Sequence, residues 1–100
     1  MIRHIIIRPE AEDDLDAAFD WYEAQRPGLG REFAQEISLC IDRIAGSPLL
    51  FADIGANKRR ALGRKFPFAV YYLTNAQDIV VLAVLHCARD PETLKKRKRY

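Results

Sequence analysis

Three residues in the second half of the chain have the side-chain types that metal-independent RNA cleavage requires: Arg64, His86 and Arg89. A histidine with an ordinary pKa of about 6.5 exchanges a proton near neutral pH, so His86 is a candidate general base or acid. Guanidinium groups beside it would stabilise the charge that develops when a ribose 2′-hydroxyl attacks the adjacent phosphate. The alternative is a structural histidine at a strand end whose ring hydrogen-bonds the backbone, and the residue types alone favour this alternative.

Basic side chains gather in the second half of the chain, although the net charge is only +2. Residues 1–54 hold five basic and eleven acidic side chains, a net charge of −6, whereas residues 55–100 hold eleven basic and three acidic ones, a net charge of +8. This asymmetry predicts a basic face for RNA, DNA or an acidic protein. The alternative is a solvated edge strand, where basic residues discourage aggregation. The candidates for target binding are Arg59, Arg60, Arg64, Lys65, Arg89, Lys95, Lys96 and Arg97.

The first half of the chain predicts one strand and two helices. Residues 2–8 are rich in β-branched side chains, which predicts a strand covered on both faces. Pro9 and the acids after it begin a helix that ends near Arg26 at a Pro-Gly break. A second helix is expected over 29–45, so the two pack as an antiparallel hairpin. Trp21 lies off the apolar stripe of the first helix, and either packs at the helix flank or is reserved for a partner.

The second half predicts a sheet. Residues 49–57 form a loop whose large apolar side chains pin it to the core, and 58–64 form a basic strand or edge. Residues 79–86 are apolar on both faces, so this strand is central and 67–74 is its hairpin partner. The order β-α-α-β-β-β predicts an α+β fold, a helical hairpin packed on a mostly antiparallel sheet. A short basic helix or tail is expected after Asp90.

Length and composition narrow the class further. One hundred residues predict a single domain over 1–100. The longest near-continuous apolar stretch is far shorter than the roughly 20 residues of a membrane span, so no such span is expected. Two cysteines without a disulfide framework fit a reducing compartment, so a cytoplasmic protein is expected. Cys40 and Cys87 predict two buried thiols rather than a disulfide framework or a metal site. Gly28 and Gly30 fall between two helices and not after a strand, so no nucleotide cofactor is expected.

Four segments in this order resemble one protein family over nearly the whole chain. They are Pro9–Leu15 after the opening strand, the pair Trp21-Tyr22, the segment Pro67–Tyr72 and the run Ile79–Pro91 with its histidine and Arg-Asp pair. Together they resemble the RelE/ParE superfamily of bacterial toxins from toxin–antitoxin (plasmid-stabilisation) operons. The last segment is the most specific and is more similar to the ParE branch than to the RelE branch.

The resemblance implies two alternative targets. ParE-like members inhibit DNA gyrase, whereas RelE-like members cut mRNA in the ribosomal A site with lysines, arginines and a tyrosine or other acid–base group near the C-terminus. Arg60, Arg64 and Arg89 match the basic roles, but no clear tyrosine precedes the end of the last strand and Tyr100 is the final residue. This departure favours gyrase inhibition over ribosome-dependent cleavage.

The resemblance also implies a partner protein and no cofactor. Members of the superfamily form hetero-oligomers with a cognate antitoxin whose extended, partly helical segment wraps the toxin, an interaction suited to folding on binding. The candidate contacts for an antitoxin are the large apolar residues Trp21, Leu49, Leu50 and Phe51. A third alternative is a non-toxic module that only binds an antitoxin.

Overall fold

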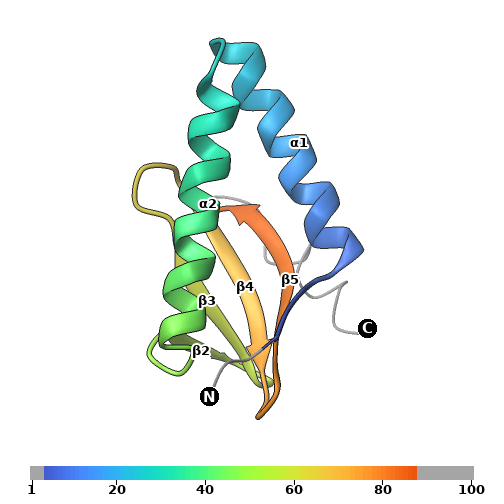
Figure 1. Ribbon diagram of the computed structural model, residues 1–100, viewed down its shortest axis with the longest axis vertical. Helices are drawn as coiled ribbons and strands as arrows, with labels where there is room; N and C mark the ends of the chain where they lie inside the picture. Colours follow the sequence, from blue (N-terminus) through green and yellow to red (C-terminus); the bar gives the residue numbers. More distant parts are fainter. Residues whose placement is uncertain (1–3, 88–100) are drawn as a thin grey trace.

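Two long helices precede four of the five strands in the chain. The computed structural model describes residues 4–87, so the predicted basic tail and the candidates Arg89, Lys95, Lys96 and Arg97 lie outside the described residues. The predicted α+β fold and element order are confirmed, with one more strand than expected. The elements are β1 (His4–Ile7), α1 (Pro9–Gln25), α2 (Leu29–Gly46), β2 (Ala52–Gly55), β3 (Lys58–Leu62), β4 (Phe68–Thr74) and β5 (Asp78–His86) (Figure 1).

The five strands form one sheet in the order β1-β5-β4-β3-β2. β1 runs parallel to β5, while the other neighbouring pairs are antiparallel. The predicted central position of the last strand is confirmed, because every residue from Ile79 to Leu85 is buried. The prediction that the first strand is covered on both faces is wrong: among residues 4–87, β1 stands at the edge of the sheet beside β5, and Ile5 and Ile6 are about two-fifths exposed.

The two helices form the predicted antiparallel hairpin and lie on one face of the sheet (Figure 1). Pro9 occupies the first turn of α1, where its missing N–H costs no hydrogen bond, and Glu10 and Glu12 complement the positive end of the helix dipole. The chain reverses at Gly28, whose φ of 89° suits glycine. The tip of the hairpin projects beyond the sheet, so the apolar stripes reach the sheet only from the lower part of each helix (Figure 1).

The core lies between the helices and the sheet. The predicted stripe of α2 is confirmed: Phe33, Ile37, Cys40 and Ile44 are buried and Ile41 is half-buried. Tyr72 is fully buried, and its hydroxyl donates a hydrogen bond of 2.6 Å to the carbonyl of Pro48. Burial raises the pKa of Tyr72 to about 12, so the hydroxyl stays protonated and continues to donate.

Four details of the sequence-based picture need correction. The segment expected as a loop over 49–57 contains β2, because its backbone pairs with β3. Leu49 and Leu50 are 60% and 83% exposed, so of the three large apolar side chains only Phe51 is held at the core. Phe19, expected in the stripe of α1, is 38% exposed and lines an open hollow between α1 and α2. Cys87 is exposed at the end of β5, whereas Cys40 is buried as expected.

No helix within residues 4–87 is both long enough and apolar enough to cross a lipid bilayer.

Candidate functional site

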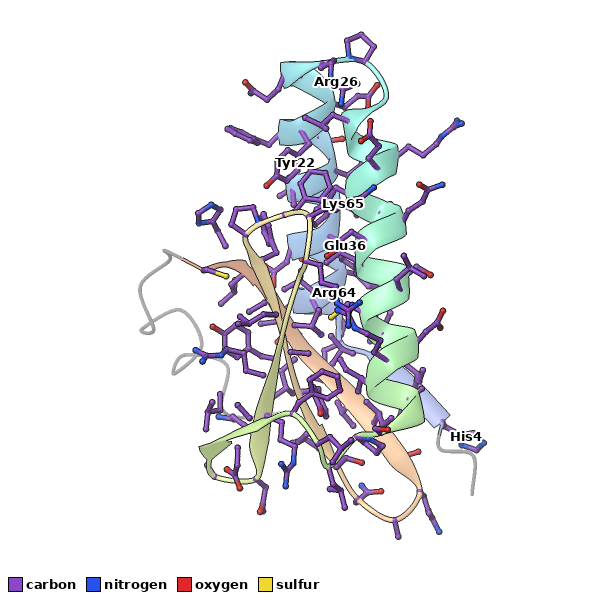
Figure 2. The ribbon with its side chains drawn as sticks, turned by 90° about the vertical axis from the view of Figure 1, so that its left-hand side faces the viewer. His4, Tyr22, Arg26, Glu36, Arg64 and Lys65 are labelled. Atoms are coloured by element: carbon purple, nitrogen blue, oxygen red, sulfur yellow. The ribbon has the colours of Figure 1, made fainter. Side chains whose placement is uncertain are left out.

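The connection between β3 and β4, residues 63–67, carries two of the predicted basic residues. Its backbone is held by the carboxylate of Glu36 on α2, which accepts hydrogen bonds from the backbone N–H groups of Arg64 and Lys65, the second at 3.0 Å. Figure 2 shows Glu36, Arg64 and Lys65 side by side where the connection meets the helix. The side chains of Arg64 and Lys65 are exposed, so the buried carboxylate fixes the backbone that presents them.

The pKa of Glu36 reflects this position. Burial of the carboxyl by itself raises its pKa, but the two backbone donors, with smaller contributions from the charges of Arg43 and Lys65, outweigh burial and hold the pKa below its ordinary value. The carboxylate is therefore ionised at neutral pH although only 5% of the residue is exposed. Its charge strengthens both backbone hydrogen bonds.

Gly63 and Phe66 complete the attachment of this connection. A Cβ atom on Gly63 would stand 2.7 Å from the carbonyl oxygen of Phe66, so only glycine fits there. The ring of Phe66 packs edge-on against Tyr22 of α1 and Phe33 of α2, with centroid distances of 4.8 and 5.7 Å. The connection is thus held by both helices and presents its charges from a fixed backbone.

Arg60 and Arg64 line one shallow hollow of about 380 Å³ at the outer edge of β3. Arg43 of α2 is the third arginine in its wall, and one of its terminal nitrogens donates to the carbonyl of Leu62 at 3.3 Å. We call this the arginine hollow. Arg43 is not among the residues predicted from the sequence, although it stands seven positions after Glu36 and so lies on the same side of α2. The other residues of the wall are Leu50, Phe51, Ala52 and Leu62.

Arg59 occupies a different position from its neighbour Arg60. It is half-buried, and its Nη1 donates to the backbone carbonyls of Leu49 and Phe51, at 3.3 and 2.8 Å. Together with Tyr72 it therefore holds the segment 48–51 by its backbone. Alternation along β3 places Arg59 on the opposite side of the strand from Arg60.

A larger apolar groove of about 660 Å³ lies between α1 and the ends of β4 and β5. Trp21 forms part of its wall and is 59% exposed, with its ring edge-on to Tyr22 at 5.1 Å. We call this the Trp21 groove. Leu50 and Phe51 line the arginine hollow instead, so the candidate antitoxin contacts occupy two separate surfaces. The other lining residues of the groove are Asp14, Ala17, Ala18, Tyr22, Pro67, Phe68, Val84, Leu85 and His86.

Two of the three candidate residues for RNA cleavage, Arg64 and His86, lie within the described part of the chain and line different hollows. His86 lines the Trp21 groove and its ring packs edge-on against Phe68 at 5.4 Å, whereas Arg64 lines the arginine hollow. Arg89 lies outside residues 4–87. Over these residues no cluster of three or more histidine, cysteine, aspartate or glutamate side chains is arranged to hold a metal ion.

Comparison with known proteins agrees with this architecture. A family model described as the ParE toxin of the type II toxin–antitoxin system parDE matches residues 5–91. Two curated relatives named Toxin ParE2, from two strains of Mycobacterium tuberculosis, are each 29% identical over 96 residues, which is 95% of this chain and 91% of theirs. A solved structure titled as a chromosomal ParDE system from P. aeruginosa has a similar fold, with a TM-score of 0.75 and 18% identity over 85% of this chain and 96% of that one.

The family model spans well over half of the chain and includes the helical hairpin, the connection over 63–67 and the central strand. The relatives match along almost all of their own length, so the resemblance is to whole toxins and not to a fragment of one. This chain belongs to the ParE toxin family and is the toxin component of a type II toxin–antitoxin system.

Proposed function

We propose that this toxin acts on DNA gyrase by binding it, and that an antitoxin neutralises it in the cytoplasm. The separation of the candidate catalytic residues supports binding over RNA cleavage, because His86 and Arg64 line different hollows. A general base must lie within hydrogen-bond reach of the group it deprotonates, while the guanidinium contacts the phosphate under attack. Residues in two hollows do not meet that requirement together.

Arg60, Arg64 and Lys65 are the described candidates for contact with the target. All three are exposed, and the last two project from a connection that Glu36 holds by its backbone. Side chains on a fixed backbone lose less conformational entropy on binding than side chains on a mobile loop. This surface is therefore suited to tight binding of an anionic or acidic target.

Inhibition of purified gyrase tests the proposal directly. The wild-type chain is expected to inhibit DNA supercoiling, and the double variant Arg60→Gln/Arg64→Gln is expected to need at least ~10-fold more protein, because two charges leave the interface. Arg31→Gln is the matched control for the single variants Arg60→Gln and Arg64→Gln, since each removes one charge and Arg31 is exposed on α2 and lines neither surface. If the double variant inhibits supercoiling as strongly as the wild type, these arginines do not contact gyrase.

Pulse labelling after induction without antitoxin separates gyrase from the ribosome as the target. The proposal expects DNA synthesis to stop before protein synthesis. An earlier stop in protein synthesis would instead favour ribosome-dependent mRNA cleavage, and the His86→Gln variant would then show whether the histidine takes part. A chain that stops neither process would be a non-toxic module.

The antitoxin is proposed to use the apolar surfaces at Trp21 and at Leu49–Phe51. Trp21 is the largest exposed apolar side chain within residues 4–87 and stands beside a groove with a floor of Ala18, Tyr22 and Phe68. Amphipathic helices bind grooves of this kind through apolar side chains on one face. An antitoxin that fills the groove would cover Trp21, so the emission of its indole would report binding.

A further inference from the structure

Strand β1 stands at one margin of the sheet formed by residues 4–87, with exposed apolar side chains on both of its faces (Figure 1). Ile5 is 40% exposed and Ile6 is 43% exposed, and they point to opposite faces because side chains alternate along a strand. The opposite margin, β2, has a charged residue, Asp53, and a bulge, which are features that protect edge strands from pairing with other chains. β1 has no lysine, proline or bulge between His4 and Ile7.

The backbone of β1 directs hydrogen-bonding groups toward this margin. The N–H groups of His4 and Arg8 donate to carbonyls on the β5 side of the strand, at 2.9 and 3.0 Å. In a parallel pair, alternate residues bond to the neighbouring strand, so the N–H and C=O groups of Ile5 and Ile7 point away from β5. The outer side of β1 therefore has the pattern of donors and acceptors that a further strand can pair with.

This edge is complementary to itself in the antiparallel direction. When two copies pair about a two-fold axis at Ile6, Ile5 of each copy stands opposite Ile7 of the other. Residues that are opposite each other with their N–H and C=O groups facing inward exchange both N–H···O=C bonds. The two Ile6 side chains meet at the intervening position, where the Cα atoms of such a pair lie only ~4.5 Å apart. One alignment thus uses the outward-pointing backbone groups and covers the exposed isoleucines.

Charges at the two ends of β1 favour the same alignment. At one end, Asp78 of β5 is paired with His4, whose Nδ1 lies 3.8 Å from the carboxylate. Arg8 follows the other end and lies on the same face as His4, because the two are four residues apart along the strand. Antiparallel pairing places Arg8 of each copy next to His4 of the other and one strand away from Asp78, so opposite charges approach. Parallel pairing would instead bring the two Arg8 side chains together.

We propose that two copies of this chain associate through their β1 strands and join their sheets into one. The interface is short, so the buried area is small and the dimer is weak, with a Kd of about 10–100 µM. No residue of β1 lines the Trp21 groove or the arginine hollow, so both surfaces stay open in each copy. The dimer presents each surface twice, and a partner with two-fold symmetry therefore binds it more tightly than it binds a single copy.

Sedimentation equilibrium of the purified chain without antitoxin tests the association. Between ~2 and ~200 µM the average mass is expected to rise from that of a monomer toward that of a dimer. Ile6→Lys is expected to stay monomeric over the same range, because a charge on an edge strand opposes pairing. Leu39→Lys is the matched control, since Leu39 is also exposed but lies on α2, and this variant should associate as the wild type does.

Disulfide formation tests the alignment. The background is Cys87→Ser, which removes the exposed native thiol. Ile6→Cys in this background is expected to form a disulfide between copies, because opposed Cα atoms at this position fall in the range that a disulfide spans, about 4.4–6.8 Å. Leu39→Cys is the control for random collision and should oxidise to a dimer at least ~10-fold more slowly. Ile6→Cys adds no charge to the strand, so this measurement remains available if Ile6→Lys does not fold.

Three results would overturn the proposal. The first is a chain that stays monomeric at every concentration. The second is a dimer that persists in Ile6→Lys, or equal rates of oxidation for Ile6→Cys and Leu39→Cys, because either result places the contact elsewhere. The third is a chain that is monomeric alone but loses affinity for its antitoxin in Ile6→Lys, which would assign β1 to the antitoxin. The gyrase proposal is unaffected by these results, because it rests on the supercoiling assay.

Discussion

Glu36 shows how a single buried carboxylate positions charges that lie outside the core. Its two backbone partners belong to Arg64 and Lys65, which are 28 and 29 residues away in the chain. The carboxylate satisfies two N–H groups that a connection without regular secondary structure would otherwise leave to solvent. The side chains of the same two residues are then free of any anchoring role and remain exposed.

Replacing the carboxylate is expected to destabilise the fold in a pH-dependent way. Glu36→Gln should lower the free energy of unfolding at pH 7 by about 1–2 kcal/mol, because charge-assisted hydrogen bonds become neutral ones. A folded-state pKa below the ordinary 4.5 stabilises the fold fully above that pH, and the contribution is lost as the pH falls through the lowered value. The gap between wild type and variant should therefore shrink in acid.

Urea unfolding at pH 7 and pH 3 measures this effect. Asp42→Asn is the control, because Asp42 is an exposed acid on the same helix, and its effect should stay within about 0.5 kcal/mol. A gap between wild type and Glu36→Gln that is equal at both pH values would contradict the role of the charge.

At the scale of elements, the helical hairpin depends on close contact at its turn. Glu23 near the end of α1 accepts hydrogen bonds from the backbone N–H groups of Gly28 and Gly30, at 2.9 and 3.0 Å. A Cβ atom on Gly30 would stand 2.9 Å from the carbonyl oxygen of Phe19. The two helices therefore approach closely here because position 30 has no side chain. At the other end of α2, a Cβ on Gly46 would meet nothing within 4 Å.

Two glycines of one helix should thus respond to alanine in opposite directions. Gly30→Ala is expected to destabilise by about 1–3 kcal/mol, because backbone must move to admit the methyl group. Gly46→Ala is expected to be neutral or to stabilise by up to about 1 kcal/mol through helix propensity. Thermal unfolding followed by circular dichroism detects this, since ~1 kcal/mol shifts the Tm of a domain this size by about 4–8 °C. A Tm for Gly30→Ala equal to the wild-type value would mean that the helices can separate at no cost.

At the scale of the whole molecule, the chain presents two surfaces of different chemistry. The Trp21 groove is bounded by α1 and the ends of β4 and β5 and is mainly apolar, whereas the arginine hollow lies at the edge of β3 beside α2. Their linings share no residue. Two binding events, or two segments of one partner, can therefore engage the toxin at the same time.

Trp21 is the single tryptophan of the chain, so the tryptophan fluorescence of the protein reports on binding in the Trp21 groove. Binding of the antitoxin encoded with this toxin is expected to shift its emission to shorter wavelength, because burial removes water from the indole. Trp21→Ala should weaken the complex by at least ~10-fold in calorimetry, the effect typical of a large aromatic anchor. Leu39→Ala is the matched control, since Leu39 is also 59% exposed but lines neither surface. If calorimetry verifies the complex but the Trp21 emission is unchanged, the antitoxin does not bind in this groove.

Local patterns in the sequence determined the helices, the order of elements and the central strand. The acids after Pro9, the glycine-containing break before Leu29 and the apolar run over 79–85 act through neighbours in the chain, so each is visible without a fold. The same patterns could not tell an edge strand from a central one at β1, since β-branched residues suit both positions. They also missed β2, whose pairing with β3 depends on a partner elsewhere in the chain.

Only the tertiary structure decided which polar residues act together. Glu36 meets Arg64 and Lys65 because α2 crosses the connection between β3 and β4, and no local pattern encodes a contact across 28 residues. For the same reason Arg43 joins Arg60 and Arg64 at one hollow, while His86 lines another. The sequence by itself determined that basic residues are plentiful in the second half; the packing of α2 against the sheet decided which of them share a surface.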